Sequence, residues 1–172
     1  GWPASMTQSV QAPTYRREPV VWEEFRSLAL PLLGERFPPN LIEDNGDSIV
    51  FTSRRDYSSY VLTKAERGII IAYEGERNTV VPFCITKSPE LAATCLTLLA
   101  RDGIATLTDM SYTPRDLLGP VPHTAFTISK SSPPFFELTS TIDPTVCATC
   151  RSFACARAMA EASAPSPDSP RP

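Results

Sequence analysis

The sequence has 172 residues, 42% of them hydrophobic, and its formal net charge is −3. This length and apolar content are typical of one compact domain. The acidic balance argues against nucleic acid as the main partner, because nucleic-acid binding calls for a basic surface. No apolar run approaches the length that spans a bilayer, and no signal peptide is visible, so the sequence predicts a cytoplasmic protein that makes no membrane contact.

The composition separates a polar arm, one domain and a tail. Residues 1–17 are polar, and the first five, GWPAS, precede Met6 in the manner of a cloning remnant. We expect this arm to be flexible. Residues 162–172 are mostly Pro, Ser and Ala, which cannot build a core, so we expect a disordered tail. The residues between them, 18–161, are predicted to form a single α+β domain.

The centre of this domain is predicted to be an antiparallel β-meander. Four short runs rich in β-branched and aromatic residues follow one another, joined by links too short for parallel crossovers. These runs are Ile49–Thr52, Tyr60–Thr63, Ile69–Tyr73 and Thr79–Ile85. Pro82 lies within the last run and cannot donate a ladder hydrogen bond, so it predicts either a sheet edge or a bulge.

Helices are predicted on both sides of this meander in the sequence, which gives a two-layer fold with three helices in total. The first helix begins near Pro19, a residue that suits the first helical turn, and ends or kinks at Pro31. The second begins after Ser88, a good N-cap, with Pro89 at its first position, and ends at Asp102.

The last part of the domain is predicted to contain a hairpin and the third helix. The runs His123–Lys130 and Phe135–Thr141 pair as the hairpin. Asp143 and Pro144 then repeat the capping pattern of a helix start, and Val146, Cys150 and Phe153 follow helical spacing. We therefore predict a third helix that packs on the sheet through these three side chains.

The cysteines raise the question of metal or redox chemistry. They are Cys84, Cys95, Cys147, Cys150 and Cys155. An odd number at uneven spacing is a poor disulfide framework, so thiols are expected. Cys147 and Cys150 have a C-x-x-C spacing, but zinc usually takes four ligands, and on one helix Cys150 and Cys155 would point about 140° apart. The sequence therefore predicts no metal and no cofactor, and the thiols are interpreted as small buried apolar groups.

No enzyme motif is present in the sequence, which lacks a Walker loop, G-x-S-x-G and G-x-G-x-x-G. His123 is the only histidine. A catalytic cysteine and histidine need only meet in space, so a small cysteine-dependent enzyme remains the third alternative. No catalytic residue is assigned, and the favoured interpretation is a non-enzymatic protein.

Charged and aromatic residues gather on the connections of the meander. Tyrosine and arginine are over-represented at protein interfaces, so these connections are predicted to bind a protein partner. The candidate partner-binding residues are Arg54, Arg55, Tyr57, Tyr60, Lys64, Glu66 and Arg67. An ordinary solvated rim is the competing interpretation. Both a monomer and a homodimer fit the pattern.

The stretch YVLTKAERG at Tyr60–Gly68, followed by further strands and the helix Ser88–Arg101, resembles the TNT antitoxin family over roughly residues 41–103. The resemblance implies a small immunity protein that binds and inhibits a toxin of the NAD glycohydrolase type. No contact residue of the family can be placed on this chain. The order of elements is also similar to that of type III secretion chaperones and YbjN-like proteins. That second resemblance implies a chaperone-like or scaffold adaptor for a secreted effector.

Overall fold

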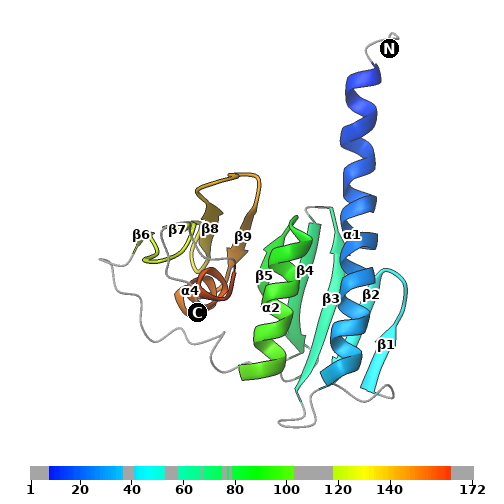
Figure 1. Ribbon diagram of the computed structural model, residues 1–172. Helices are drawn as coiled ribbons and strands as arrows, with labels where there is room; N and C mark the ends of the chain where they lie inside the picture. The colour runs from blue at the N-terminus through cyan, green and yellow to red at the C-terminus, as the bar shows by residue number, and fades with distance from the viewer. Residues whose placement is uncertain are drawn as a thin grey trace.

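The computed structural model of the protein describes residues 8–36, 41–52, 58–66, 68–74, 77, 79–102 and 118–163. Within this part of the chain, nine strands form one open antiparallel sheet and three helices cover one of its faces (Figure 1). This arrangement confirms the predicted α+β fold class. No helix in the described ranges is both long and apolar enough to cross a membrane.

The sheet order places the last strand of the chain in the middle of the sheet. In chain order the elements are α1 (Gln8–Arg36), β1 (Ile42–Asp44), β2 (Ser48–Thr52), β3 (Ser59–Ala65), β4 (Gly68–Glu74), β5 (Val80–Thr86), α2 (Pro89–Asp102), β6 (Gly119–Pro120), β7 (Phe126–Lys130), β8 (Phe136–Ser140), β9 (Cys147–Cys150) and α4 (Phe153–Ala162). In space the strands follow the order β1-β2-β3-β4-β5-β9-β8-β7-β6. We call β1–β5 the first half of the sheet and β6–β9 the second half.

The strand register shows which side chains share a face, because directly opposed residues on paired strands point to the same side. One row crosses six strands and is buried against the helices: Ile49, Leu62, Ile71, Cys84, Cys150 and Phe136. The adjacent row lies on the opposite side and is only partly buried: Ser48, Thr63, Ile70, Ile85, Thr149 and Glu137. We call this second side the open face, since the described residues place no helix on it.

Pro82 produces a bulge, which was one of the two alternatives that the sequence predicted. Ile71 opposes Cys84 but its neighbour Ala72 opposes Pro82, so Phe83 is an extra residue on β5. Phe83 and Cys84 are both fully buried as a result. As a whole β5 is not an edge strand, because it pairs with β4 on one side and with β9 on the other. The pairing with β9 covers only Cys84–Thr86, so Pro82 itself lies outside it.

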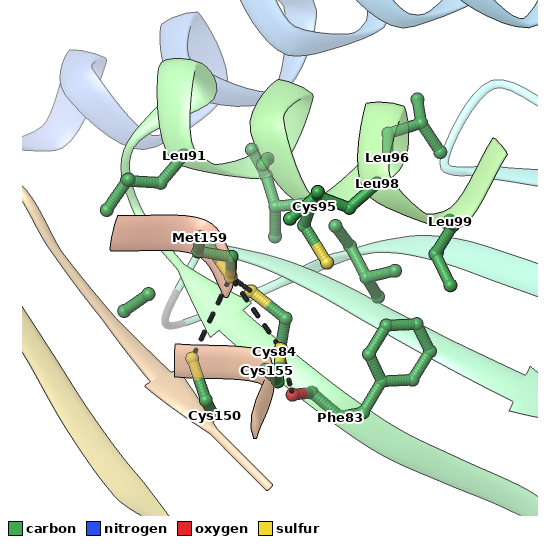
Figure 2. Close-up of a cluster of buried hydrophobic side chains, with 14 of the residues drawn as sticks. Phe83, Cys84, Leu91, Cys95, Leu96, Leu98, Leu99, Cys150, Cys155 and Met159 are labelled. Carbon is green, nitrogen blue, oxygen red and sulfur yellow. Dashed lines mark hydrogen bonds between the residues drawn. The ribbon is translucent and has the colours of Figure 1, made fainter. Parts of the chain in front are cut away.

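The second helix begins as the sequence predicts. The Ser88 hydroxyl accepts a hydrogen bond from the amide of Leu91 at 3.1 Å, and α2 starts at Pro89. Such a cap satisfies a backbone donor that has no partner inside the helix. Leu91, Cys95 and Leu98 form a buried stripe toward the sheet and α4 (Figure 2).

The first helix is longer than predicted. It begins at Gln8, so residues 8–17, which the sequence assigned to the polar arm, are helical. It also continues through Pro31 to Arg36. A proline inside a helix removes one hydrogen bond, but packing of an apolar face can outweigh that loss. Here Trp22, Phe25, Ala29 and Leu33 supply such a face, and all four are buried.

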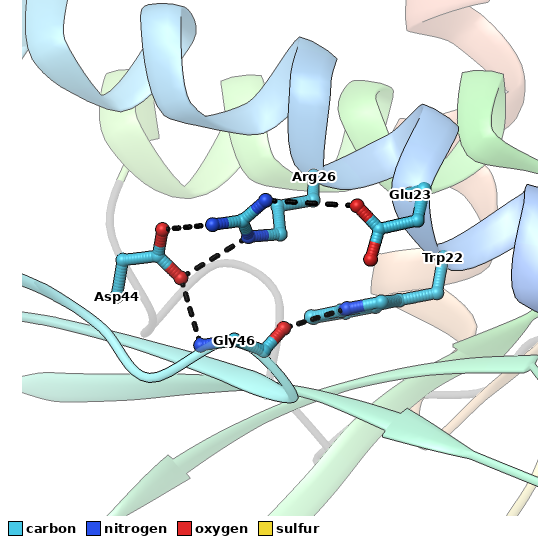
Figure 3. Close-up of polar contacts among 5 residues, drawn as sticks. All are labelled: Trp22, Glu23, Arg26, Asp44 and Gly46. Atoms are coloured by element: carbon cyan, nitrogen blue, oxygen red, sulfur yellow. Dashed lines mark hydrogen bonds and ion pairs between the residues drawn. The ribbon is translucent and has the colours of Figure 1, made fainter.

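Polar contacts hold α1 against the β1–β2 turn (Figure 3). The indole Nε1 of Trp22 donates to the carbonyl of Gly46 at 2.8 Å. Arg26 binds Asp44 through two nitrogens, with Nη2 to Oδ2 at 2.6 Å and Nε to Oδ1 at 3.2 Å. Asp44 also accepts from the Gly46 amide at 3.0 Å. The hydrogen bonds from Arg26 and then from Gly46 lower the pKa of Asp44.

The prediction of a third helix starting at Asp143 is wrong. Asp143 accepts from the amide of Thr145 in a local turn, and the next residues form strand β9. The helix α4 starts only at Phe153, where the Ser152 hydroxyl accepts from the amide of Cys155 at 3.0 Å. A strand forms here instead of a helix because Cys147–Cys150 can pair with β5 and β8 at once. This double pairing satisfies the backbone groups of the strand on both sides.

Candidate functional site

The structure describes only part of the predicted set of partner-binding residues. Arg54, Arg55, Tyr57 and Arg67 lie outside the described residues. Lys64, near the end of β3, and Glu66, in the turn between β3 and β4, are both exposed. Tyr60 is not exposed, and the strand register explains why.

Tyr60 belongs to the core and not to an exposed connection. Only 1% of its surface is exposed, and its ring stacks on Phe51 with the centroids 5.0 Å apart. Phe51 opposes Tyr60 directly across β2 and β3, on the face that the helices cover. Alternation along β3 therefore directs this tyrosine inward, beside Leu62, and it is unavailable to a partner.

The predicted residues also fall at opposite ends of one strand. Strand β3 spans seven residues, Ser59–Ala65. At roughly 3.3 Å per residue, its two ends lie about 20 Å apart. The start of β3 and the turn after it are therefore too far apart to form one compact patch. Of the predicted residues, the structure places Lys64 and Glu66 at the second of these two ends.

A hollow on the open face was not predicted from the sequence. It has a volume of about 610 Å³, within the range of roughly 300–1,000 Å³ that is usual for binding pockets. It lies over β5, β9 and β8, beside the β7–β8 turn. Its lining residues are Ile85, Thr86, Lys87, Ser131, Ser132, Phe135, Glu137, Thr145, Cys147, Ala148 and Thr149. We call it the open-face hollow.

The polar groups of the open-face hollow are held in place by neighbouring strands. The Thr149 hydroxyl donates to Glu137 Oε1 at 3.1 Å, across the directly opposed pair of β9 and β8. Behind the hollow, on the helix-covered side of β5, the Thr86 hydroxyl donates to the carbonyl of Cys147 at 2.6 Å. Lys87 supplies a positive charge at the same site. The hollow thus combines one carboxylate, one ammonium group and several hydroxyls on a rigid sheet.

Lys87 joins the open-face hollow to the turn that the sequence did predict. A Cβ atom added at Gly68 would lie 3.0 Å from Lys87 Cγ and only 2.4 Å from the Thr86 carbonyl oxygen. Gly68 has a positive φ of 124°, so a side chain there is excluded by both conformation and space. Gly68, the first residue of β4, therefore lies beside Lys87 at the edge of the hollow. The β3–β4 turn, which leads into Gly68, is close to the hollow along the sheet.

Cys147 is the only thiol that lines the hollow, and its surroundings do not activate it. Partial burial, followed by the charge of Glu137, raises its pKa, and Lys87 only opposes this shift. A nucleophilic cysteine requires the reverse, a lowered pKa and a nearby base. His123 is exposed in the turn before β7 and is not among the lining residues. The hollow thus contains no cysteine–histidine pair.

The other four cysteines meet in the core, which corrects the predicted divergence of Cys150 and Cys155. Cys150 lies on β9 and not on the helix, so the helical angle between the two does not apply. The Sγ atoms of Cys84, Cys150 and Cys155 lie 4.0, 3.8 and 3.7 Å from Sδ of Met159 (Figure 2). Cys95 approaches the same group from α2. We call these residues the sulfur cluster.

All four thiols of the sulfur cluster are fully buried, and all five cysteines of the chain are reduced. Hydrogen bonds to Cys155 and Cys84, together with burial, raise the pKa of both Cys95 and Cys150 well above the ordinary value. Among the described residues, no three histidine, cysteine, aspartate or glutamate side chains are placed to hold a metal ion. The contacts of the cluster are those of packed core side chains.

The sequence holds no local signal for strand β9, which forms the floor of the hollow. Burial alternates along Cys147–Cys150 in the structure, with every second residue buried. The residue types Cys-Ala-Thr-Cys do not alternate between polar and apolar, so their pattern does not distinguish a strand from a helix.

Comparison of the chain with protein-family models, with curated proteins and with solved structures found no match.

Proposed function

We propose that this chain is a non-enzymatic protein-binding module whose binding surface is the open face of its sheet. The observation that carries the proposal is the placement of α1, α2 and α4 on one side of the sheet, with no described helix on the other. A sheet with one bare side presents a broad, rigid surface. Broad and rigid surfaces suit another protein better than they suit a small substrate.

The side chains of the open face have the mixed character of a protein interface. Ile70 and Ile85 are apolar, and their neighbours in the same row, Thr63 and Thr149, carry hydroxyls. Interfaces that form and dissociate are about as apolar as the rest of a protein surface, with aromatic or arginine anchors seated in pockets. The open-face hollow offers such a pocket, and Glu137 within it suits an arginine of the partner.

Within this class, we propose an immunity protein that acts in the cytoplasm and inhibits a toxin of the NAD glycohydrolase type. The proposal extends the resemblance of Tyr60–Gly68 to the TNT antitoxin family. That stretch is β3 with the β3–β4 turn and Gly68, which lies beside Lys87 at the edge of the hollow. The resemblance and the open-face surface thus point to the same part of the molecule. Inhibition would be stoichiometric, by covering the active site of the toxin.

The experiment co-expresses the chain with the product of the neighbouring gene, and measures binding and NAD hydrolysis by that product. Ile85→Arg and Thr149→Arg place a long charged side chain on the open face, and each should weaken binding by about tenfold or more. Leu28→Arg is the matched control, because Leu28 lies on α1 and is 44% exposed. The control should bind like the wild type. Equal binding by all three variants would place the interface elsewhere.

The chaperone-like or scaffold adaptor is the second candidate, and one observation favours it. Strand β9 pairs only with Cys84–Thr86 of β5, so the other end of β5 has no partner strand on that side among the described residues. Val80 at this end is 54% exposed. An extended segment of a secreted effector could add there as a strand, although Pro82 removes one donor. Val80→Asp should weaken binding of an adaptor's effector and leave toxin inhibition unchanged.

A further inference from the structure

Two thiols of the sulfur cluster are directly opposed on paired strands. Cys84 on β5 and Cys150 on β9 are register partners, and both are fully buried. Cys95 and Cys155 come from helices α2 and α4 and have no such backbone pairing. The pair 84–150 is therefore the one whose separation is determined by a hydrogen-bonded ladder.

The ladder places this pair at a position that suits a disulfide bond. The amide of Arg151 donates to the carbonyl of Phe83 at 3.0 Å, one residue beyond each cysteine. That bond identifies Cys84 and Cys150 as a non-hydrogen-bonded pair, for which Cα atoms lie about 4.5 Å apart. Disulfides require a Cα separation of about 4.4–6.8 Å. The backbone therefore needs no large rearrangement to accept a bond between the two sulfurs.

The location of the pair gives such a bond a structural consequence. The two halves of the sheet are joined by only three register pairs: Cys84 with Cys150, Ile85 with Thr149, and Thr86 with Ala148. The second and third of these pairs lie at the open-face hollow. A covalent link at the first pair would hold both halves in register at their narrowest junction.

We propose that Cys84 and Cys150 are an oxidative modification site, at which hydrogen peroxide converts the two thiols into a cross-strand disulfide that joins the halves of the sheet. This inference does not depend on the proposed function, because it rests on the register and the burial of the two residues. The oxidant is small and uncharged, which suits a site that a bulky disulfide reagent does not reach.

The reaction proceeds in two balanced steps. The thiolate of Cys84 attacks one oxygen of peroxide, which forms a sulfenic acid and releases hydroxide that is protonated to water. The thiol of Cys150 then attacks the sulfenic sulfur, so that the S–S bond forms, the S–O bond breaks and a second water leaves with the thiol proton. Each sulfur gives up one electron and peroxide is reduced to two waters. Of the two paired thiols, Cys84 is the better first nucleophile, because hydrogen bonds from Cys150 and Cys95 lower its pKa, whereas the pKa of Cys150 is raised.

The test oxidises the folded, full-length Cys147→Ala protein with peroxide, blocks remaining thiols and digests it with trypsin without reduction. Removing Cys147 matters because it shares the tryptic peptide 131–151 with Cys150, whereas Cys84 lies in 78–87, Cys95 in 88–101 and Cys155 in 152–157. We expect a loss of about 2 Da in the intact protein and a linked peptide joining 78–87 to 131–151, both reversed by a thiol reductant. The thermal midpoint should rise by about 5–15 °C.

Variants and alternative products decide the outcome. Cys150→Ala should abolish the linked peptide, and Cys155→Ala should leave it in place. A gain of about 16 Da on Met159 without a cross-link, a linked peptide to Cys95 or Cys155 instead, or a cross-link that forms only in urea would each overturn the proposal. If a variant fails to fold, the wild-type digest still shows whether 78–87 is linked to 131–151, and fragmentation of the linked peptide assigns the bond to Cys147 or to Cys150.

Discussion

The two halves of the sheet are stabilised by different kinds of contact. In the first half each strand pairs with the next strand in the chain, and α1 buries large side chains such as Trp22 and Phe25 against it. In the second half, β9 is inserted between β5 and β8, and α4 contributes mostly small buried residues, among them Cys155, Ala156 and Ala160. Large side chains bury more apolar area, so the first half should contribute more to stability. Small ones let α4 lie close to its neighbours.

Truncating Trp22 should have the largest effect. This side chain is 1% exposed, contacts Phe25 and donates to the Gly46 carbonyl. Trp22→Ala should lower the free energy of unfolding by about 3–5 kcal/mol, measured by urea denaturation. Trp22→Phe is the matched control, because it keeps most of the ring and loses the hydrogen bond, with an expected cost nearer 1 kcal/mol. Equal losses for the two variants would show that the hydrogen bond, and not the packing, dominates.

Phe153→Ala should give the next largest loss and tests the second half in the same way. Phe153 is 5% exposed and meets Phe136 edge to face, with the ring centroids 6.1 Å apart. We expect a loss of about 3 kcal/mol, at the low end for a buried phenylalanine, because α4 lies at the end of the described chain. A change near zero would show that α4 is peripheral. Two separate unfolding transitions in this variant, but not in Trp22→Ala, would show that the halves unfold independently.

Comparison of the halves also explains what the sequence could predict. The first half depends on neighbours in the chain, so runs such as Ile69–Tyr73 and the cap at Ser88 were enough to place strands β2–β5 and helix α2. Local patterns also gave the β7–β8 hairpin. Strand β9 depends on β5, which lies more than sixty residues earlier, and no local pattern reports that pairing. The wrong prediction of a helix at β9 had two consequences. With Cys150 placed on a helix, neither the sulfur cluster nor the open-face hollow could be predicted.

Tyr60 shows the same limit within the first half. A tyrosine beside charged residues suggested an interface. The side of the strand on which Tyr60 lies, however, depends on the register with Phe51. A shift of one residue would reverse that assignment. The exposure of Lys64 and Glu66 does not depend on the register in the same way, because both residues lie at the end of β3. Exposure was thus predictable at the turn and not along the strand.

Removing the helix caps should lower the free energy of unfolding less than removing core side chains does. The two caps also allow α2 and α4 to be compared directly. Ser88 and Ser152 each accept an amide hydrogen bond from the residue three positions later, at 3.1 and 3.0 Å. Ser88→Ala and Ser152→Ala should each lower the free energy of unfolding by about 1 kcal/mol. Serine to glycine at the same positions should cost only a few tenths. A much larger loss at Ser152, which is 1% exposed, would indicate that its buried hydroxyl serves more than the cap.

Acidification should have the smallest effect, and it acts on the first half alone. The hydrogen bond from Arg26, reinforced by the Gly46 amide, lowers the pKa of Asp44 below its ordinary value of 3.8. A carboxyl group with a lowered pKa in the folded state contributes stability above its unfolded pKa, and that contribution is lost as the pH falls through the folded pKa. Wild type should therefore lose part of its advantage over Asp44→Asn as the pH falls below about 4. Because the pair is solvent-exposed, added salt should reduce the difference in stability between wild type and Asp44→Asn at neutral pH.

Urea denaturation of both proteins at pH 6 and pH 3 measures this difference. Glu161→Gln is the control, because Glu161 forms an ion pair with Arg157 in the second half of the sheet's structure. A difference between wild type and Asp44→Asn that is unchanged by pH and salt would show that Asp44 stabilises the turn through shape and not through charge.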